Sequence, residues 1–363
     1  MLGKKKLLAV LVGLWLLGLG LTPQKASFAA GPAGYQTVPG PAPRLKTDTE
    51  GQVAEVVEEV YRLYLREVTL SGKKLLIRIP FGQYGERYAG QAIFGGGKAA
   101  PWDIWPKIER ILESEDFKQY LETLDQPGEK LVLLDVPRRK VEIIIDEKRR
   151  EMAKARFLGS KLYPCEIKEE AGFSEIDIYN YLYAKGIGVD CSGFSFFVLR
   201  YIAHQYGINL YRAIGIGPLY IGNWIYHPGN VDVVDDRIIN LRPGDVVLFH
   251  CWNRPNCHSL VLGEIDFAKG EITYYQCTDW VADRSQRGPH RAKIFFDPAF
   301  PNRRLTDPEV VWEKEVGEAF PEEDCPYRGR TDDYRYSIRG QGRIVRLKIL
   351  ANLLREKEPL YFK

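Results

Sequence analysis

Two hydrophobic periods along the chain predict helices and strands. Apolar residues recur every three to four positions in residues 49–63, 103–124 and 191–206, as expected for amphipathic helices. Shorter apolar or alternating runs, bounded by turn residues, predict strands. These strands are Leu75–Pro80, Leu131–Val136, Val141–Ile145, Val246–Phe249, Ser259–Leu262, Ile272–Tyr275, Lys293–Phe296 and Arg343–Ile349. A helix followed by successive strands favours an α+β fold with antiparallel pairing over an alternating α/β fold.

The first 29 residues have the three-part pattern of a secretory signal peptide. A basic cluster, Lys4–Lys6, precedes an apolar run of 15 residues, Leu7–Leu21, and small residues follow at Ser27 and Ala29. The apolar run is shorter than the ~20 residues that a membrane-spanning helix needs. We therefore expect cleavage after Ala29 or Ala30, and a protein that is secreted or held in a bacterial-type cell envelope. An uncleaved anchor is the alternative.

Composition divides the remaining chain into a linker, two regions and a tail. Residues 30–46 are rich in Pro and Gly, which predicts an extended linker. Residues 47–150 form an N-terminal α+β region without a motif that indicates a function. Residues 155–350 form a second α+β region, and residues 351–363 form a C-terminal tail.

The overall composition and charge exclude several classes of protein. Of the 363 residues, 45% are hydrophobic and 27% are charged, as in ordinary globular proteins, and the mean hydropathy of −0.27 excludes a polytopic membrane protein. The net charge of +3 becomes −1 once the +4 of the signal peptide is subtracted. Because Lys and Arg are interleaved with Asp and Glu, nucleic-acid binding is not expected.

Six cysteines permit up to three disulfides in an exported chain. Cys251 and Cys257 bracket a five-residue loop and are the strongest candidates for a bridge. Spacing alone does not assign the other pairs, and Cys191 stands in a different context.

Cys191 is predicted at the first turn of an amphipathic helix, directly after Asp190. The N–H groups and the positive dipole end of a helix favour a thiolate, and the same groups can stabilise an oxyanion in acyl transfer. Asp190 can cap the helix, and Gly193 allows a substrate to approach the backbone closely. We therefore treat Cys191 as a candidate nucleophile; a packing or capping role is the alternative.

A histidine at the start of a strand is the expected base. His258 opens the predicted strand that ends at Leu262, so its ring can face a cleft while later residues pack; His250 is the alternative. The following strand leads to Gln276, whose side-chain oxygen can orient the imidazole, with Asp279 as the charged alternative. The other histidines are expected outside the site: His204 too far along the helix, and His227 and His290 at the surface.

Three ordered segments resemble the NlpC-type family of cell-wall cysteine peptidases, whose domains are papain-like α+β folds. The segments are Asp190-Cys191-Ser192-Gly193-Phe194, Leu241-Arg242-Pro243-Gly244-Asp245 and His258-Ser259-Leu260-Val261-Leu262-Gly263. The resemblance covers residues 160–300, and extends to 350 with the last strand. It implies Cys191 as nucleophile, His258 as base and Gln276 as the orienting residue, where many members of the family have His.

The resemblance also implies a substrate and its contacts. The family cleaves peptidoglycan stem peptides, typically between γ-D-glutamate and a diamino acid. No cofactor is implied, and the Cys and His spacings do not match a zinc site. Tyr181 is an alternative to Tyr183, since the Gly-Gly that follows the Tyr of the family is missing here. The segment between Cys191 and His258 is longer than in the family and contains Trp224, Tyr226 and Trp252. These aromatic residues could form a groove wall for sugar or peptide, or pack in a satellite core. The residues expected to contact substrate are Asp190, Ser192, Tyr183 and Trp252.

Two other functions compete with this interpretation. One is a different reaction on the same fold, that of an amidase, acyltransferase or transpeptidase acting on lipids or polyamines. The other is a catalytically silent module that binds the cell wall. The Cys191–His258 pair argues against the silent module, whereas Gln276 and the missing Gly-Gly favour it.

Overall fold

The computed structural model describes residues 49–82, 99–158, 163–215, 226–251, 254–278, 287–313 and 342–355. The side chains of residues 49, 250–257 and 352–355 lie outside this description. The expected signal peptide and linker also lie outside it, as does most of the expected tail. Within the described residues, no helix has both the length and the apolar character needed to cross a membrane.

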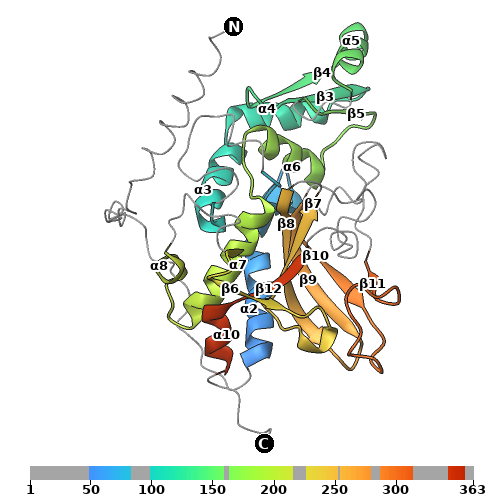
Figure 1. The fold of residues 1–363 in the computed structure, drawn as a ribbon. Coiled ribbons are helices and arrows are strands. Elements are labelled where there is room, and N and C mark those ends of the chain that lie inside the picture. The colour runs from blue at the N-terminus through green and yellow to red at the C-terminus, as the bar shows by residue number, and fades with distance from the viewer. Residues whose placement is uncertain are drawn as a thin grey trace, which may run out of the picture. The chain divides into compact units, whose positions relative to one another are not determined.

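A seven-stranded antiparallel sheet organises the second half of the chain (Figure 1). In chain order its strands are β6 (Val231–Val234), β7 (Val246–Cys251), β8 (Arg254–Asp266), β9 (Glu271–Thr278), β10 (Gly288–Phe295), β11 (Val311–Trp312) and β12 (Arg343–Leu347). Their order across the sheet is β11-β10-β9-β8-β7-β12-β6. The α+β class with antiparallel pairing is therefore confirmed. The last strand is shorter than expected, because the chain turns at Lys348 into a helix, α10 (Lys348–Arg355).

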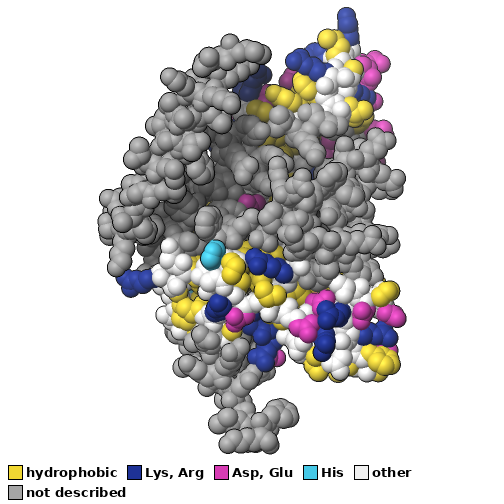
Figure 2. Space-filling model, in the orientation of Figure 1, with side chains coloured by type: hydrophobic (Ala, Val, Ile, Leu, Met, Phe, Trp, Pro, Cys, Tyr) yellow, Lys and Arg dark blue, Asp and Glu magenta, His cyan; other side chains and the backbone are white. Residues whose placement is uncertain are grey.

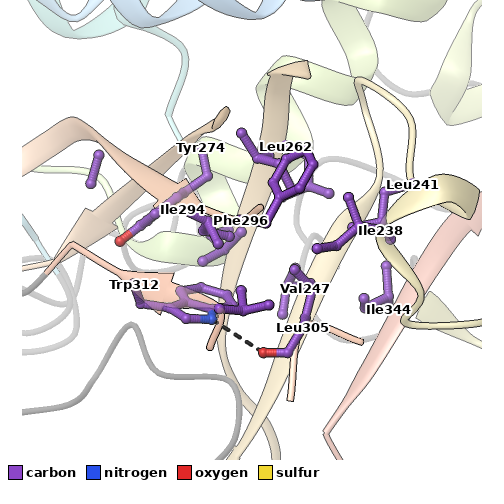
Figure 3. Close-up of a cluster of buried hydrophobic side chains, with 14 of the residues drawn as sticks. Ile238, Leu241, Val247, Leu262, Tyr274, Ile294, Phe296, Leu305, Trp312 and Ile344 are labelled. Atoms are coloured by element: carbon purple, nitrogen blue, oxygen red, sulfur yellow. Dashed lines mark hydrogen bonds between the residues drawn. The ribbon is translucent and has the colours of Figure 1, made fainter. Parts of the chain in front are cut away.

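One face of this sheet is covered by an apolar cluster (Figure 3). Side chains alternate between the two faces of a strand, so Leu260 and Leu262 of β8 point into this cluster together with Tyr274 of β9. Trp312 of β11 packs beside Tyr274, and its indole Nε1–H donates to the carbonyl oxygen of Leu305 in the preceding loop at 3.4 Å.

Two helices pack on the opposite face of the sheet. They are α2 (Thr49–Leu63) and α7 (Cys191–Gln205), and both contact β8. The Tyr275 hydroxyl of β9 donates to Glu58 of α2 at 2.6 Å, and Tyr64, just after α2, lies edge-on to the ring of Phe194 in α7. The apolar stripe that the sequence predicts for the first helix is therefore buried by elements of the second region.

The expected division between residues 47–150 and 155–350 does not separate two folded units. Residues Pro43–Lys363 group as one unit by their contacts. Phe81, which follows the hairpin β1 (Leu65–Leu70) and β2 (Lys73–Arg78), forms a bridge with Val189. The N-terminal region thus supplies part of the core on which α7 rests.

Residues 101–184 build a smaller helical and three-stranded part. Its elements are α3 (Pro101–Leu112), α4 (Glu115–Leu124), β3 (Lys130–Asp135), β4 (Lys140–Ile144), α5 (Glu147–Phe157), β5 (Cys165–Lys168) and α6 (Glu175–Ala184). The single helix expected over residues 103–124 is wrong. It is split at Ser114, whose hydroxyl accepts from the N–H of Phe117 and caps α4. Two short elements, α8 (Leu210–Ile214) and a 3-10 turn (Ile238–Asn240), lie between α7 and β7.

Charged side chains of both signs are mixed on the described surface. On the face shown in Figure 2, Lys and Arg lie next to Asp and Glu over the lower part of the molecule. This distribution matches the interleaving that the sequence predicts.

A buried ion pair fastens the turn before β7 to the last strand. Asp245 is fully buried and receives two hydrogen bonds of 2.7 Å from the guanidinium of Arg346 on β12, and one from the N–H of Arg242. Burial raises the pKa of Asp245, while the Arg346 hydrogen bonds act in the opposite direction. The Pro-Gly-Asp turn of the sequence motif therefore has a structural role.

We predict that Arg346→Met destabilises the fold by about 3–5 kcal/mol, because it leaves the Asp245 carboxylate buried without its partner. An unpaired buried carboxyl has a raised pKa and is tolerated best when protonated. The loss should therefore grow as the pH rises above about 4, the ordinary Asp value. Urea unfolding at several pH values measures it. The double variant Asp245→Asn/Arg346→Met is the control and should recover most of the stability; a cost below about 1 kcal/mol for Arg346→Met contradicts the prediction.

Candidate active site

Cys191 is the first residue of α7, as the sequence predicts. Asp190 has extended backbone angles, and its Oδ1 accepts from the N–H of Gly193 at 2.6 Å and from the Ser192 hydroxyl at 3.0 Å. This is an N-cap, which satisfies one of the N–H groups of the first turn. Asp190 and Ser192 are thus bonded to each other, and Cys191 is half-buried beside them.

The strand-like segment that leads into α7 is held on two sides. The N–H of Val189 donates to Pro80 at 2.9 Å, and its carbonyl oxygen accepts from the N–H of Gly82 at 3.0 Å. The same carbonyl oxygen accepts from the thiol of Cys277 on β9 at 3.1 Å. A Cβ on Gly82 would lie 2.4 Å from the Cα of Gly188, so the approach of these two segments requires glycine.

A pair of buried serines joins α7 to β8. The Ser195 hydroxyl donates to the carbonyl oxygen of Cys191 at 2.8 Å, and it lies 2.9 Å from the hydroxyl of Ser259. Ser259 directly follows His258, just as Cys277 directly follows Gln276. The start of α7 is therefore fixed to β8 and β9 at the residues next to both predicted partners.

His258 and Gln276 are hydrogen-bonded to each other. Nε2 of His258 lies 2.5 Å from Oε1 of Gln276, and the imidazole packs against the Phe249 ring with 5.5 Å between centroids. The side chains are 5% and 0% exposed. An amide oxygen can only accept, so this bond requires the proton on Nε2 and leaves the lone pair of a neutral ring on Nδ1. The contact expected between the two strands is confirmed.

Neighbouring residues on β8 and β9 point to opposite faces of the sheet. Ser259 and Cys277 point to the side that carries α7, whereas His258 and Gln276 share the side of Leu260. Helix attachment and imidazole orientation are therefore built from alternate residues of the same two strands.

Cys191 carries a thiol and is not part of a disulfide, and the same holds for Cys165 and Cys277. The possibility of three disulfides is therefore wrong. The proposed Cys251–Cys257 bridge lies outside the described side chains. Four other predicted positions also lie outside the described side chains: His250, Trp252, Trp224 and Asp279.

Tyr226 and Tyr181, two candidates for residues lining the site, are both buried in the core. Tyr226 is 1% exposed, which agrees with packing in the core and not with an open groove wall; burial raises the pKa of its hydroxyl. Tyr181 packs between Phe117 and Tyr120 in the α4–α6 interface, and burial raises its pKa to about 12. Tyr183 is half-buried on α6.

His290 is the one described histidine whose expected environment is wrong. It lies in β10, fully buried and directly opposite Gln276, with Nδ1 2.9 Å from the carbonyl oxygen of Gly288. The alternation of His290, Ala292 and Ile294, all buried on one face, was the available sign that the strand begins earlier than Lys293. His227 is exposed, as expected, and His204 lies in the last turn of α7, at the opposite end of the helix from Cys191.

Among the described residues, no group of three or more His, Cys, Asp or Glu side chains has an arrangement that could hold a metal ion. The described groups of the candidate site are a thiol, an imidazole, an amide and the N–H groups of a helix start.

The Asp190 cap can be tested by paired substitutions. We expect Asp190→Ala to lower the free energy of unfolding by about 1 kcal/mol, because the N–H of Gly193 loses its acceptor. Asp190→Asn keeps an acceptor oxygen at this position and should cost much less. Urea unfolding compares the two variants; equal losses for Ala and Asn would show that the charge of Asp190 matters rather than its cap.

No known family model, no characterised protein and no solved structure matches this chain.

Proposed function

We propose that this protein is an exported cysteine hydrolase that cleaves an amide bond in the stem peptide of peptidoglycan. The observation that carries the proposal is the buried hydrogen bond between Nε2 of His258 and Oε1 of Gln276. It selects the tautomer in which Nδ1 is the basic nitrogen, as a general base requires. The γ-D-glutamyl–diamino acid bond follows from the resemblance of the sequence motifs to the NlpC-type family.

The position of Cys191 supports its role as the nucleophile. A helix N-terminus lowers the pKa of a thiol, because the anion interacts favourably with the N–H groups and the dipole. Asp190 caps the helix by accepting from the N–H of Gly193. On either side of Cys191, Ser195 contacts Ser259 of β8 and the carbonyl oxygen of Val189 accepts from Cys277 of β9. The proposal further requires the Cys191 thiolate to reach the imidazole of His258 on β8.

The proposed reaction proceeds in two steps. The Cys191 thiolate attacks the amide carbonyl, and the backbone N–H groups at the start of α7 stabilise the tetrahedral oxyanion. The protonated imidazole of His258 then transfers a proton to the leaving amine. In the second step His258 removes a proton from water, which attacks the thioester and releases the acid. Gln276 keeps the ring oriented throughout.

Thiol reactivity tests the nucleophile. Cys191 should react with iodoacetamide at about pH 6 much faster than a model thiol, since only the thiolate attacks. Cys165 is the internal control, because burial raises the pKa of its thiol and should slow the reaction. Mass spectrometry assigns the label to each residue. Equal rates at Cys191 and a model thiol would favour the silent wall-binding module.

Clearing of a purified cell-wall suspension tests the substrate, with Cys191→Ala as the inactive control. Gln276→Leu should lower kcat by a factor on the order of 10², because the imidazole loses its orienting acceptor. Gln276→His should retain more activity. Tyr274→Phe, on the same strand and face, should leave kcat unchanged. A reactive Cys191 without wall clearing would point to an amidase or acyltransferase with another substrate.

A further inference from the structure

One side of α5 packs on the small three-stranded sheet, and the other side faces solvent. Ala153 is buried in this interface, and Phe157 is partly buried beside it. Both residues belong with the apolar side chains of Leu131 and Ile144 on the sheet. The fold therefore uses one stripe of α5, and packing does not explain the composition of the opposite stripe.

The period of the helix defines the stripe that faces solvent. Residues three and four positions apart share a face, so the neighbours of Met152 on the helix surface are those at positions 148, 149, 155 and 156. All of them are exposed, and none is acidic. The two acidic residues of the helix, Glu147 and Glu151, lie at least about 100° around the helix from Met152. We call the following set the basic face of α5: Lys148, Arg149, Met152, Ala155 and Arg156.

Exposed apolar side chains accompany these cations. Met152, at the centre of the basic face, is 65% exposed. Ile145, just before the helix, is 47% exposed, and Leu158, just after it, is 79% exposed. Single exposed apolar residues are normal on a protein surface. Their recurrence before, within and after one helix points to contact with an apolar phase.

The ion pairs of α5 leave it with a net positive charge, since the helix carries five basic and two acidic residues. Arg149 pairs with Glu142 at 2.6 Å, but both side chains are at least half exposed, and such pairs are weak and screened by salt. The Arg156 guanidinium lies 4.9 Å from the centroid of the Phe157 ring, a contact that preserves its charge. Figure 2 shows Lys and Arg beside hydrophobic side chains over the region where Figure 1 places α5.

We propose that the basic face of α5 docks on the surface of an anionic lipid bilayer. Lipid phosphates attract Lys and Arg, and apolar side chains such as Met and Leu enter the boundary between headgroups and acyl chains. A helix bound in this way lies on the membrane and does not span it. The proposal goes beyond the proposed function and does not depend on it, because the basic face shares no residue with the candidate active site.

Two other kinds of partner fit the basic face less well. A soluble polyanion would use the charges of Lys148, Arg149 and Arg156 but would leave the exposed apolar side chains in water. A protein groove that receives a helix needs large apolar anchors on successive turns, and the basic face offers one, Met152. A lipid surface uses both the charges and the apolar side chains.

Vesicle flotation tests the proposal on the native protein. The chain from residue 31 onward is used, so that the apolar run of the expected signal peptide does not itself bind lipid; residues Pro43–Lys363 group as one unit by their contacts. The protein should float with vesicles made of equal parts of phosphatidylglycerol and phosphatidylcholine, and not with vesicles of phosphatidylcholine alone. Equal flotation with both kinds of vesicle, or flotation with neither, overturns the proposal.

Two double variants with the same change in net charge locate the binding surface. Lys148→Glu/Arg156→Glu should lower the association constant for the anionic vesicles at least about tenfold, because each cation near an anionic surface contributes to binding. Lys74→Glu/Arg212→Glu is the control, since it reverses two exposed cations outside α5 and should retain most of the binding. Equal losses in the two variants would show that net charge alone matters, which overturns the proposal.

Met152→Ser distinguishes a bilayer from a soluble polyanion. It keeps every charge of the basic face and removes its large apolar side chain, so vesicle binding should fall several-fold. Vesicle binding equal to that of the native protein overturns the assignment to a bilayer. The substituted side chains are exposed, and circular dichroism melting checks that each variant folds; should one not fold, the comparison of the two kinds of vesicle on the native protein still decides the proposal.

Discussion

The attachment of the start of α7 to the end of the β8–β9 pair is the constraint on which the candidate site depends. Two short polar contacts make it, between Ser195 and Ser259 and between Cys277 and the Val189 carbonyl. They lie inside a buried interface, where hydrogen bonds gain strength from the low local dielectric. The first turn of the helix is therefore tied to the strands more specifically than its apolar face would require.

Because side chains alternate along a strand, β8 and β9 can both attach the helix and orient the imidazole. Odd-numbered residues attach the helix, and even-numbered residues orient the imidazole, since His258 and Gln276 stand on the face of Leu260. Shifting either strand by one residue would exchange the two sets and destroy both. The pairing of Phe249 with His258 and of Leu260 with Gln276 fixes this register, and the irregularity between β7 and β8 comes only after Phe249.

The N-terminal region is part of the same folded unit as the candidate site. Glu58 of α2 accepts from Tyr275 of β9, Tyr64 packs on Phe194, and Phe81 pairs with Val189 two residues before the candidate nucleophile. Deleting this region would expose the apolar face of α7 and remove one side of the support of Val189. Its contribution to the site is therefore structural, whatever else it binds.

The sequence by itself determined the start of α7 and the antiparallel pairing of the strands, because helix caps and alternating strands are local patterns. It named Gln276 as a candidate partner of His258 but left Asp279 as an alternative; the tertiary structure shows the contact with Gln276. It could not determine that α2 is covered by a distant region, that Ser114 caps the start of a second helix, or that His290 is buried. These depend on which surfaces meet in three dimensions. A polar residue such as His290 is buried because of the residues that lie next to it on neighbouring strands, and a single sequence does not show which residues these are.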